Sequence, residues 1–181
     1  MERPHVQRLP ESQVARSGND VAELMAWLEG SALGHAMRNS GVWTYGLVNL
    51  THILGIASLF GAMLVLDLRL LGAWRRVPLA AVARPAVPVA TTGFIVAATS
   101  GLCLITTNAT EYVGNPFLLI KFPAIALGLA NAVVVSRLTA WKARETRDPT
   151  PHERRHLAVA GAISLLSWLT AIASGRLIGY W

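Results

Sequence analysis

The chain has 181 residues, of which 53% are hydrophobic and only 14% are charged, and its mean hydropathy is +0.44. This composition lies outside the usage of soluble globular proteins and predicts an integral membrane protein. The net charge of +6 comes mostly from basic residues between apolar blocks, so we expect no nucleic acid partner. The single cysteine, Cys103, excludes an intrachain disulfide and a metal site built on several cysteines.

The first 39 residues predict a tail and a short surface helix. Residues 1–20 are polar, carry mixed charge and lack the apolar core of a secretory signal peptide, so we expect a polar tail. In residues 21–39 the apolar side chains, among them Val21, Leu24 and Leu28, recur on one helical stripe, and Asp20 precedes them as a helix cap. This pattern predicts an amphipathic helix that lies along the membrane interface.

Four apolar blocks follow, each close to or above the roughly 20 residues that a helix needs to cross a bilayer. They predict spans over about 42–66, 79–107, 116–141 and 156–178. Short connections favour an all-α, up-down four-helix bundle over residues 40–181. Small residues suited to helix contacts occur in every span: Gly55 and Gly61, Ala97 and Gly101, Ala124 and Gly128, and Ala160, Ser164, Ser167, Ala171 and Gly175.

The positions of arginine and lysine predict the orientation. The connections between spans one and two and between spans three and four are rich in these residues, which places both connections in the cytoplasm. The connection between spans two and three carries only Glu111 as a charge. We therefore expect both termini outside, although Arg3, Arg8 and Arg16 of the tail run against this assignment.

His52 is the one histidine deep inside a predicted span, roughly 15 Å from the start of that span at Val42. In one interpretation its imidazole ligates the iron of a b-type haem, with Gly55 allowing the flat macrocycle to approach the helix. In the other, His52 forms a hydrogen bond to Asn131 or to a serine across a helix interface, without chemistry of its own. Ionisable residues inside a membrane favour the functional interpretation.

A second haem ligand is hard to find in the chain. His35 is a weak candidate, because it approaches His52 only if the interfacial helix folds over the outer end of the bundle. His152 and His156 belong to the opposite end. A five-coordinate haem, or one shared with another subunit, would remove this difficulty.

Two basic residues lie near the outer ends of spans three and four. Lys121 and Arg176 either extend to the lipid headgroups or pair with an anionic group, such as a haem propionate, a quinone oxygen or Glu111. At the inner end, Asp67 and Arg69 are too close in sequence to pair with each other. We expect each to pair with an arginine or with backbone at a helix end, in a structural role.

Copper is a further alternative. His35, Met37, Met25 and Met63 are available as ligands, but no cluster with ligand spacing occurs. Catalytic triads, phosphate-binding loops and nucleic-acid motifs are absent from the sequence, so we expect a non-catalytic protein.

Three segments carry a family resemblance: "THILGIASLFGAMLVLDLRLLG", "NPFLLIKFPAIALGLANA" and "SGRLIGY". They resemble small uncharacterised bacterial four-helix membrane proteins that are distantly similar to the membrane domain of copper resistance protein D. The resemblance covers about Leu28 to Trp181 and implies a place in a bacterial inner membrane. The family-like positions are His52, Asp67, Arg69, Asn115, Pro116, Lys121, Asn131, Gly175 and Arg176.

The sequence leaves three hypotheses for the function. The first is a subunit that binds b-type haem through His52, with Lys121 and Arg176 at the propionates, and passes electrons between the quinone pool and a periplasmic or membrane redox partner. The second is a non-catalytic subunit that stabilises or anchors a larger membrane complex. The third is the transport of copper or of a small solute.

Overall fold

The computed structural model describes residues 11–181, and of residues 11–18 it describes the backbone alone. The described chain is mostly helical and contains no strand, which confirms the all-α prediction. Among the described residues, four helices are long and apolar enough to cross a membrane: α3 (Gly41–Leu71), α4 (Leu79–Ile105), α5 (Pro116–Arg137) and α7 (Pro151–Leu177), the last extended by η3 (Ile178–Tyr180). Three short elements connect them: η1 (Ala109–Tyr112), α6 (Thr139–Lys142) and η2 (Ala143–Glu145).

The outer faces of these helices carry large apolar side chains. Leu47, Ile53, Leu119 and Leu166 are each more than half exposed. A soluble protein rarely leaves so much apolar surface in contact with water, whereas hydrocarbon covers it at no cost. These faces are compatible with contact to a lipid bilayer, as expected of a multi-pass membrane protein.

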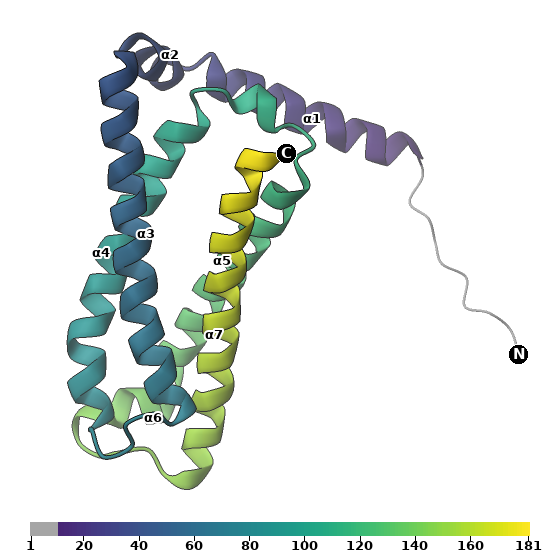
Figure 1. Cartoon of the computed structure of the whole chain (residues 1–181). Coiled ribbons are helices and arrows are strands. Elements are labelled where there is room, and N and C mark those ends of the chain that lie inside the picture. Colours follow the sequence, from purple (N-terminus) through teal and green to yellow (C-terminus); the bar gives the residue numbers. More distant parts are fainter. Residues whose placement is uncertain (1–10) are drawn as a thin grey trace, which may run out of the picture.

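The four long helices pack in the order α4, α3, α7, α5. The most extensive contacts join α3 to α4 and α5 to α7, and α3 then packs on α7 to connect the two pairs. Successive long helices run in opposite directions, as Figure 1 shows. This arrangement places α3 and α7 in the centre and α4 and α5 at the edges.

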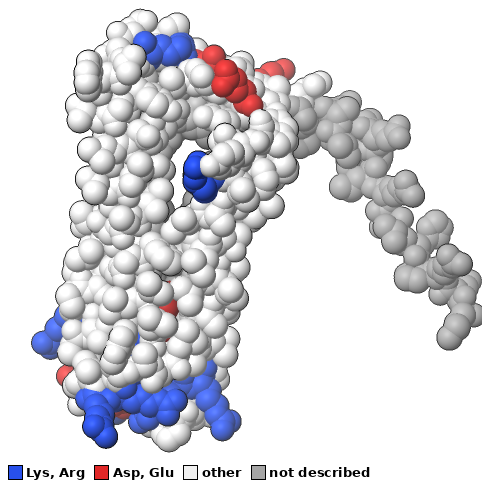
Figure 2. Space-filling model, viewed as in Figure 1, with Lys and Arg blue, Asp and Glu red and all other residues white. Residues whose placement is uncertain are grey.

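The buried core is concentrated at the end that carries α6. There one cluster combines residues of all four long helices, including Leu66, Leu79, Val135 and Leu157. A second cluster, built on Leu59, Ala90 and Trp168, lies nearer the middle. The opposite half is more open, and Figure 2 shows a hollow between α3 and α7 with basic side-chain atoms on its wall.

Two helices precede the bundle where the sequence predicts one. The chain forms α1 (Glu11–Glu29) and α2 (Ala32–Asn39), which lie across one end of the long helices in Figure 1. The break occurs because the Ser31 hydroxyl caps α2 by accepting a hydrogen bond from the Gly34 amide at 3.2 Å. Of the predicted polar tail, residues 1–10 lie outside the described residues, and residues 11–20 belong to α1.

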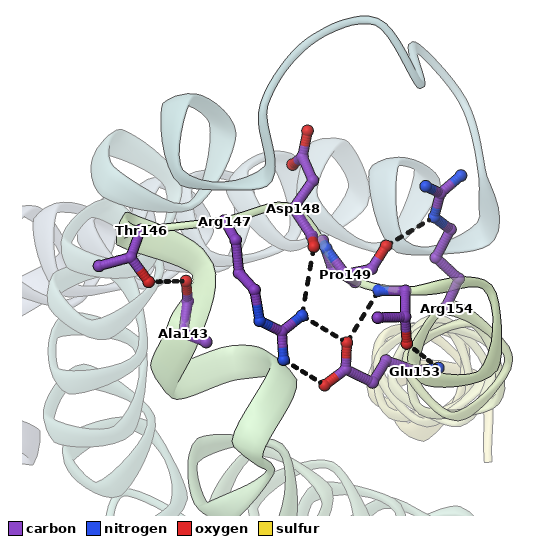
Figure 3. A network of polar contacts seen from close by, with 8 residues as sticks. Ala143, Thr146, Arg147, Asp148, Pro149, Glu153 and Arg154 are labelled. Carbon is purple, nitrogen blue, oxygen red and sulfur yellow. Dashed lines mark hydrogen bonds and ion pairs between the residues drawn. The ribbon is translucent and has the colours of Figure 1, made fainter.

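The last long helix begins at Pro151, before the start predicted near His156, because its first turn is capped (Figure 3). Thr150 and Glu153 form a capping box, in which each side chain accepts a hydrogen bond from the other residue's amide, at 3.4 and 2.8 Å. Arg147 also donates to both carboxylate oxygens of Glu153, at 2.7 and 2.8 Å. These contacts fix the connection between α6 and α7.

One acidic side chain holds α1 against the bundle. The amide and hydroxyl of Thr110 in η1 donate to the Glu29 carboxylate, at 2.9 and 2.6 Å. The hydrogen bond from the Thr110 hydroxyl, followed by that from its amide, lowers the pKa of Glu29. Beside this contact Met25 packs on Ala109 and Leu118.

The docking of α1 should therefore depend on pH. The charged carboxylate is the form that accepts these bonds, so the contact is complete above the ordinary Glu pKa of about 4.3 and is lost as the pH falls through the lowered pKa of the folded protein. A spin-label distance between α1 and η1 should lengthen in that acidic range. In Glu29→Gln the acid-induced change should disappear, and in Glu23→Gln, whose side chain is exposed on the same helix, it should remain. An unchanged acid transition in Glu29→Gln would contradict this role.

Candidate functional site

His52 faces α4, the neighbouring helix at the edge of the bundle. Its Nδ1 atom lies 2.8 Å from the carbonyl oxygen of Ala97 and 3.2 Å from the hydroxyl of Ser100. Because a carbonyl oxygen only accepts hydrogen bonds, Nδ1 carries the proton and donates to Ala97. The Ser100 hydroxyl itself donates to the carbonyl of Val96 at 2.5 Å, which holds it beside the ring.

The other ring nitrogen of His52, Nε2, is not engaged by the described residues. Nε2 makes no hydrogen bond to the described residues, and it is not among the buried side-chain atoms that lack a partner. It is therefore accessible, and the Nδ1–H tautomer leaves its lone pair unprotonated. Histidine ligands of metals are commonly held in this way, with one nitrogen donating to a backbone carbonyl and the other directed to the metal.

Two glycines that the sequence singles out determine how closely α3 and α4 approach. A Cβ atom on Gly55 would lie 2.7 Å from the Ala97 amide nitrogen, and one on Gly101 would lie 2.8 Å from Cε1 of His52. The open side of Gly55 is thus occupied by α4 and does not offer the space for a macrocycle that the sequence suggested. Gly101 makes room for the His52 ring instead.

Lys121 lies on α5, in the other helix pair from His52. Its ammonium group packs against Gly175 of α7, where an added Cβ would be 3.4 Å from Nζ. The side chain is half-buried, so it does not extend fully to the surface. Lys121 and His52 come from the two helix pairs on either side of the hollow in Figure 2.

The other predicted site residues are engaged elsewhere. Asn131 donates to the carbonyl of Ala160 at 3.0 Å, so it joins α5 to α7 and does not meet His52. The guanidinium of Arg176 donates to the Tyr180 hydroxyl and stacks on that ring, 4.5 Å from its centre. His35 is exposed on α2, with Nδ1 3.3 Å from the guanidinium of Arg38.

The sequence predicts that Asp67 and Arg69 each pair with an arginine or with backbone. This prediction was right for Arg69 and wrong for Asp67. Arg69 pairs with backbone, as expected, because its Nε donates to the carbonyl of Val77 at 2.9 Å. Asp67 pairs with no arginine, and neither of its carboxylate oxygens has a hydrogen-bond partner among the described residues. None of the salt bridges among the described residues includes Asp67.

Sequence reasoning also missed Ser100, the serine that contacts His52. The prediction of a serine partner looked to the small residues of the fourth span, whereas the contact comes from α4. A signal was present: Gly93, Ala97 and Ser100 recur at helical spacing, and all three are buried on the face that meets α3.

Residues 24–181 match the model of a family of unknown function, DUF6644. The chain belongs to this family. The DUF6644 description names no activity and gives no link to copper resistance protein D. No curated protein matches the chain, and no solved structure does.

Proposed function

We propose that this DUF6644 chain is a b-type haem-binding subunit that passes electrons between the quinone pool and a periplasmic or membrane partner. In this proposal the four long helices form an up-down bundle across a bacterial inner membrane, and α1 and α2 lie along its outer surface. Arginine and lysine gather at the α6 end, as Figure 2 illustrates, which supports a cytoplasmic position for that end and an outer position for both termini.

The observation that carries this proposal is the 2.8 Å contact between Nδ1 of His52 and the Ala97 carbonyl oxygen. An imidazole whose Nδ1–H donates to that carbonyl is kept from rotating, and its Nε2 would hold the iron of a haem. The residues fit one ligand of a haem, which supplies one-electron redox chemistry when bound. Lys121, on α5 of the other helix pair, would be the basic partner of a propionate.

The placement of His35 and Arg176 alters the ligand set first considered. Both are exposed and contact other residues, so neither is part of the proposed site. Among the described residues His52 alone would then hold the iron, and a second ligand would come from another subunit.

A visible absorption spectrum of the detergent-purified protein tests the proposal. We expect a Soret band that His52→Ala abolishes, because no other described histidine is placed to hold the iron. The matched control is His35→Ala, which removes an exposed histidine at the same end of the bundle and should leave the band unchanged. A colourless wild-type protein after expression with ample haem would overturn the proposal, and so would a band that survives in His52→Ala.

A second candidate function is a non-catalytic subunit of a larger membrane complex. The bonds of His52 to Ala97 and Ser100 favour it, because they join α3 to α4 and give the histidine a purely structural use. A colourless protein that co-purifies with a partner in constant ratio would support this function. Transport of copper is favoured less, since no group of three or more His, Cys, Asp or Glu side chains occurs among the residues that the structure describes.

A further inference from the structure

Asp67 is an acidic side chain buried within a membrane-spanning helix, far from the His52 site. It is 1% exposed and lies in α3, between the buried core residues Leu66 and Leu70. Both carboxyl oxygens are buried, and neither has a hydrogen-bond partner in the described part of the chain. A charged carboxylate in this position would lose its hydration without compensation.

No salt bridge among the described residues includes Asp67. Four arginines at this end donate to other groups: Arg69, Arg84, Arg144 and Arg154 bind Val77, Glu145, Trp141 and Pro149. The other basic side chains at this end are exposed: Arg75, Arg76, Arg137, Lys142, Arg147 and Arg155. Of the titratable residues of α7 at this end, His152 and His156 are exposed and lie against each other, with ring centres 4.6 Å apart, and Glu153 pairs with Arg147. The carboxyl group thus has no ion-pair partner among the described residues.

The polar groups beside Asp67 come from α7. Gly161 lets the two helices approach, since a Cβ there would lie 3.1 Å from the carbonyl oxygen of Asp67. One turn after Gly161, on the same face of α7, lies the buried Ser164, and Ser167 follows it. Both serine hydroxyls are buried without a partner in the described residues. A hydroxyl both donates and accepts, so it can bond either to a carboxylate or to a neutral acid.

We propose that Asp67, with Ser164 beside it, is a proton-binding site inside the membrane-spanning bundle. One proton from the aqueous phase at the α6 end forms an O–H bond to a carboxyl oxygen, and the net charge of the side chain changes from −1 to zero. The Ser164 hydroxyl then serves as the partner of the neutral acid. This site is independent of the proposed haem, because it uses neither His52 nor Lys121.

A metal cation suits this site less well than a proton. Hard cations such as Ca²⁺ and Mg²⁺ take about six oxygen ligands, usually with more than one carboxylate. The described residues around Asp67 provide one carboxylate and two serine hydroxyls, and they contain no group of three acidic or imidazole ligands. A proton needs only the carboxyl group and one neighbour.

Infrared spectroscopy of the full chain in lipid tests the proposal, because the carbonyl stretch of a protonated carboxylic acid is separate from the carboxylate bands. We expect this band near neutral pH, its loss in Asp67→Asn, and its persistence in Asp20→Asn, which removes an exposed aspartate. Ser164→Ala should shift the band to higher frequency, since the acid loses its hydrogen bond. A wild-type protein without the band, or a band that Asp67→Asn leaves in place, would overturn the proposal.

A pH titration of the unmodified protein guards against a variant that fails to fold. The carbonyl band of the wild type should decrease as the pH rises, because the buried carboxyl group then gives its proton to the aqueous phase. A band that does not change with pH would contradict the proposal. Stabilisation of the wild type, but not of Asp67→Asn, by sodium and not by potassium would also overturn it in favour of a metal cation.

Discussion

Gly93→Ala should destabilise the protein more than any other single methyl group added to the α3–α4 contact. A Cβ on Gly93 would lie 2.5 Å from the amide nitrogen of Leu59, and its other near neighbours are also backbone atoms of α3. Backbone cannot move aside as a side chain does, so the helices must separate and lose packing along their length. We expect the free energy of unfolding, measured in denaturing detergent, to fall by about 3 kcal/mol, which is at the upper end of the cost of overpacking.

Gly61→Ala is the matched control for this prediction. Gly61 also lies on α3, but no atom lies within 4 Å of the position that its Cβ would take. The added methyl group should leave stability unchanged or raise it by up to about 1 kcal/mol through helix propensity. Equal effects of the two substitutions would contradict the close contact between α3 and α4.

Trp168→Ala should have the second large effect, because this side chain connects several helices. It is 6% exposed, it packs with Leu59 and Ala90, and its ring meets Phe94 edge to face with ring centres 6.2 Å apart. Its ring also lies against Gly128 of α5. In lipid the transfer of apolar surface contributes less to stability than in water, so the lost packing accounts for most of the effect. We expect the free energy of unfolding in denaturing detergent to fall by about 2–3 kcal/mol.

The same truncation at Trp43 provides the comparison. Trp43 is 87% exposed on the first turn of α3 and makes little contact with the protein. The free energy of unfolding of Trp43→Ala in denaturing detergent should lie within about 0.5 kcal/mol of the wild-type value, as for surface substitutions in general. A loss at Trp43 as large as that at Trp168 would show that the central cluster does not control stability.

Hydropathy predicts the long helices well, because length and apolar composition are local properties of the chain. Predicted spans near 79–107 and 116–141 correspond to α4 and α5, with differences of a few residues at their ends. The break at Ser31 and the early start of α7 depend on single capping side chains, which a count of apolar residues does not register.

The partners of the polar residues were harder to predict, because they depend on how each helix rotates about its axis. Nothing in the local sequence shows that His52 turns to Ala97 while Asn131 turns to Ala160. The isolation of Asp67 is a property of the whole fold, since it depends on which residues α7 brings beside the carboxyl group. The sequence thus predicts how deep a polar residue lies in the membrane, but it does not predict which residue that side chain contacts.

Because the buried core is concentrated at one end, the two helix pairs are held together unequally along their length. All four long helices meet in one cluster at the α6 end, while the hollow separates the two helix pairs at the other. At that end the pairs are joined through η1 and the smaller cluster of Met25, Ala109 and Leu118, so we expect relative movement of the pairs to be larger there than at the α6 end. The width of the hollow, and with it the separation of His52 from Lys121, is the quantity that such movement would change.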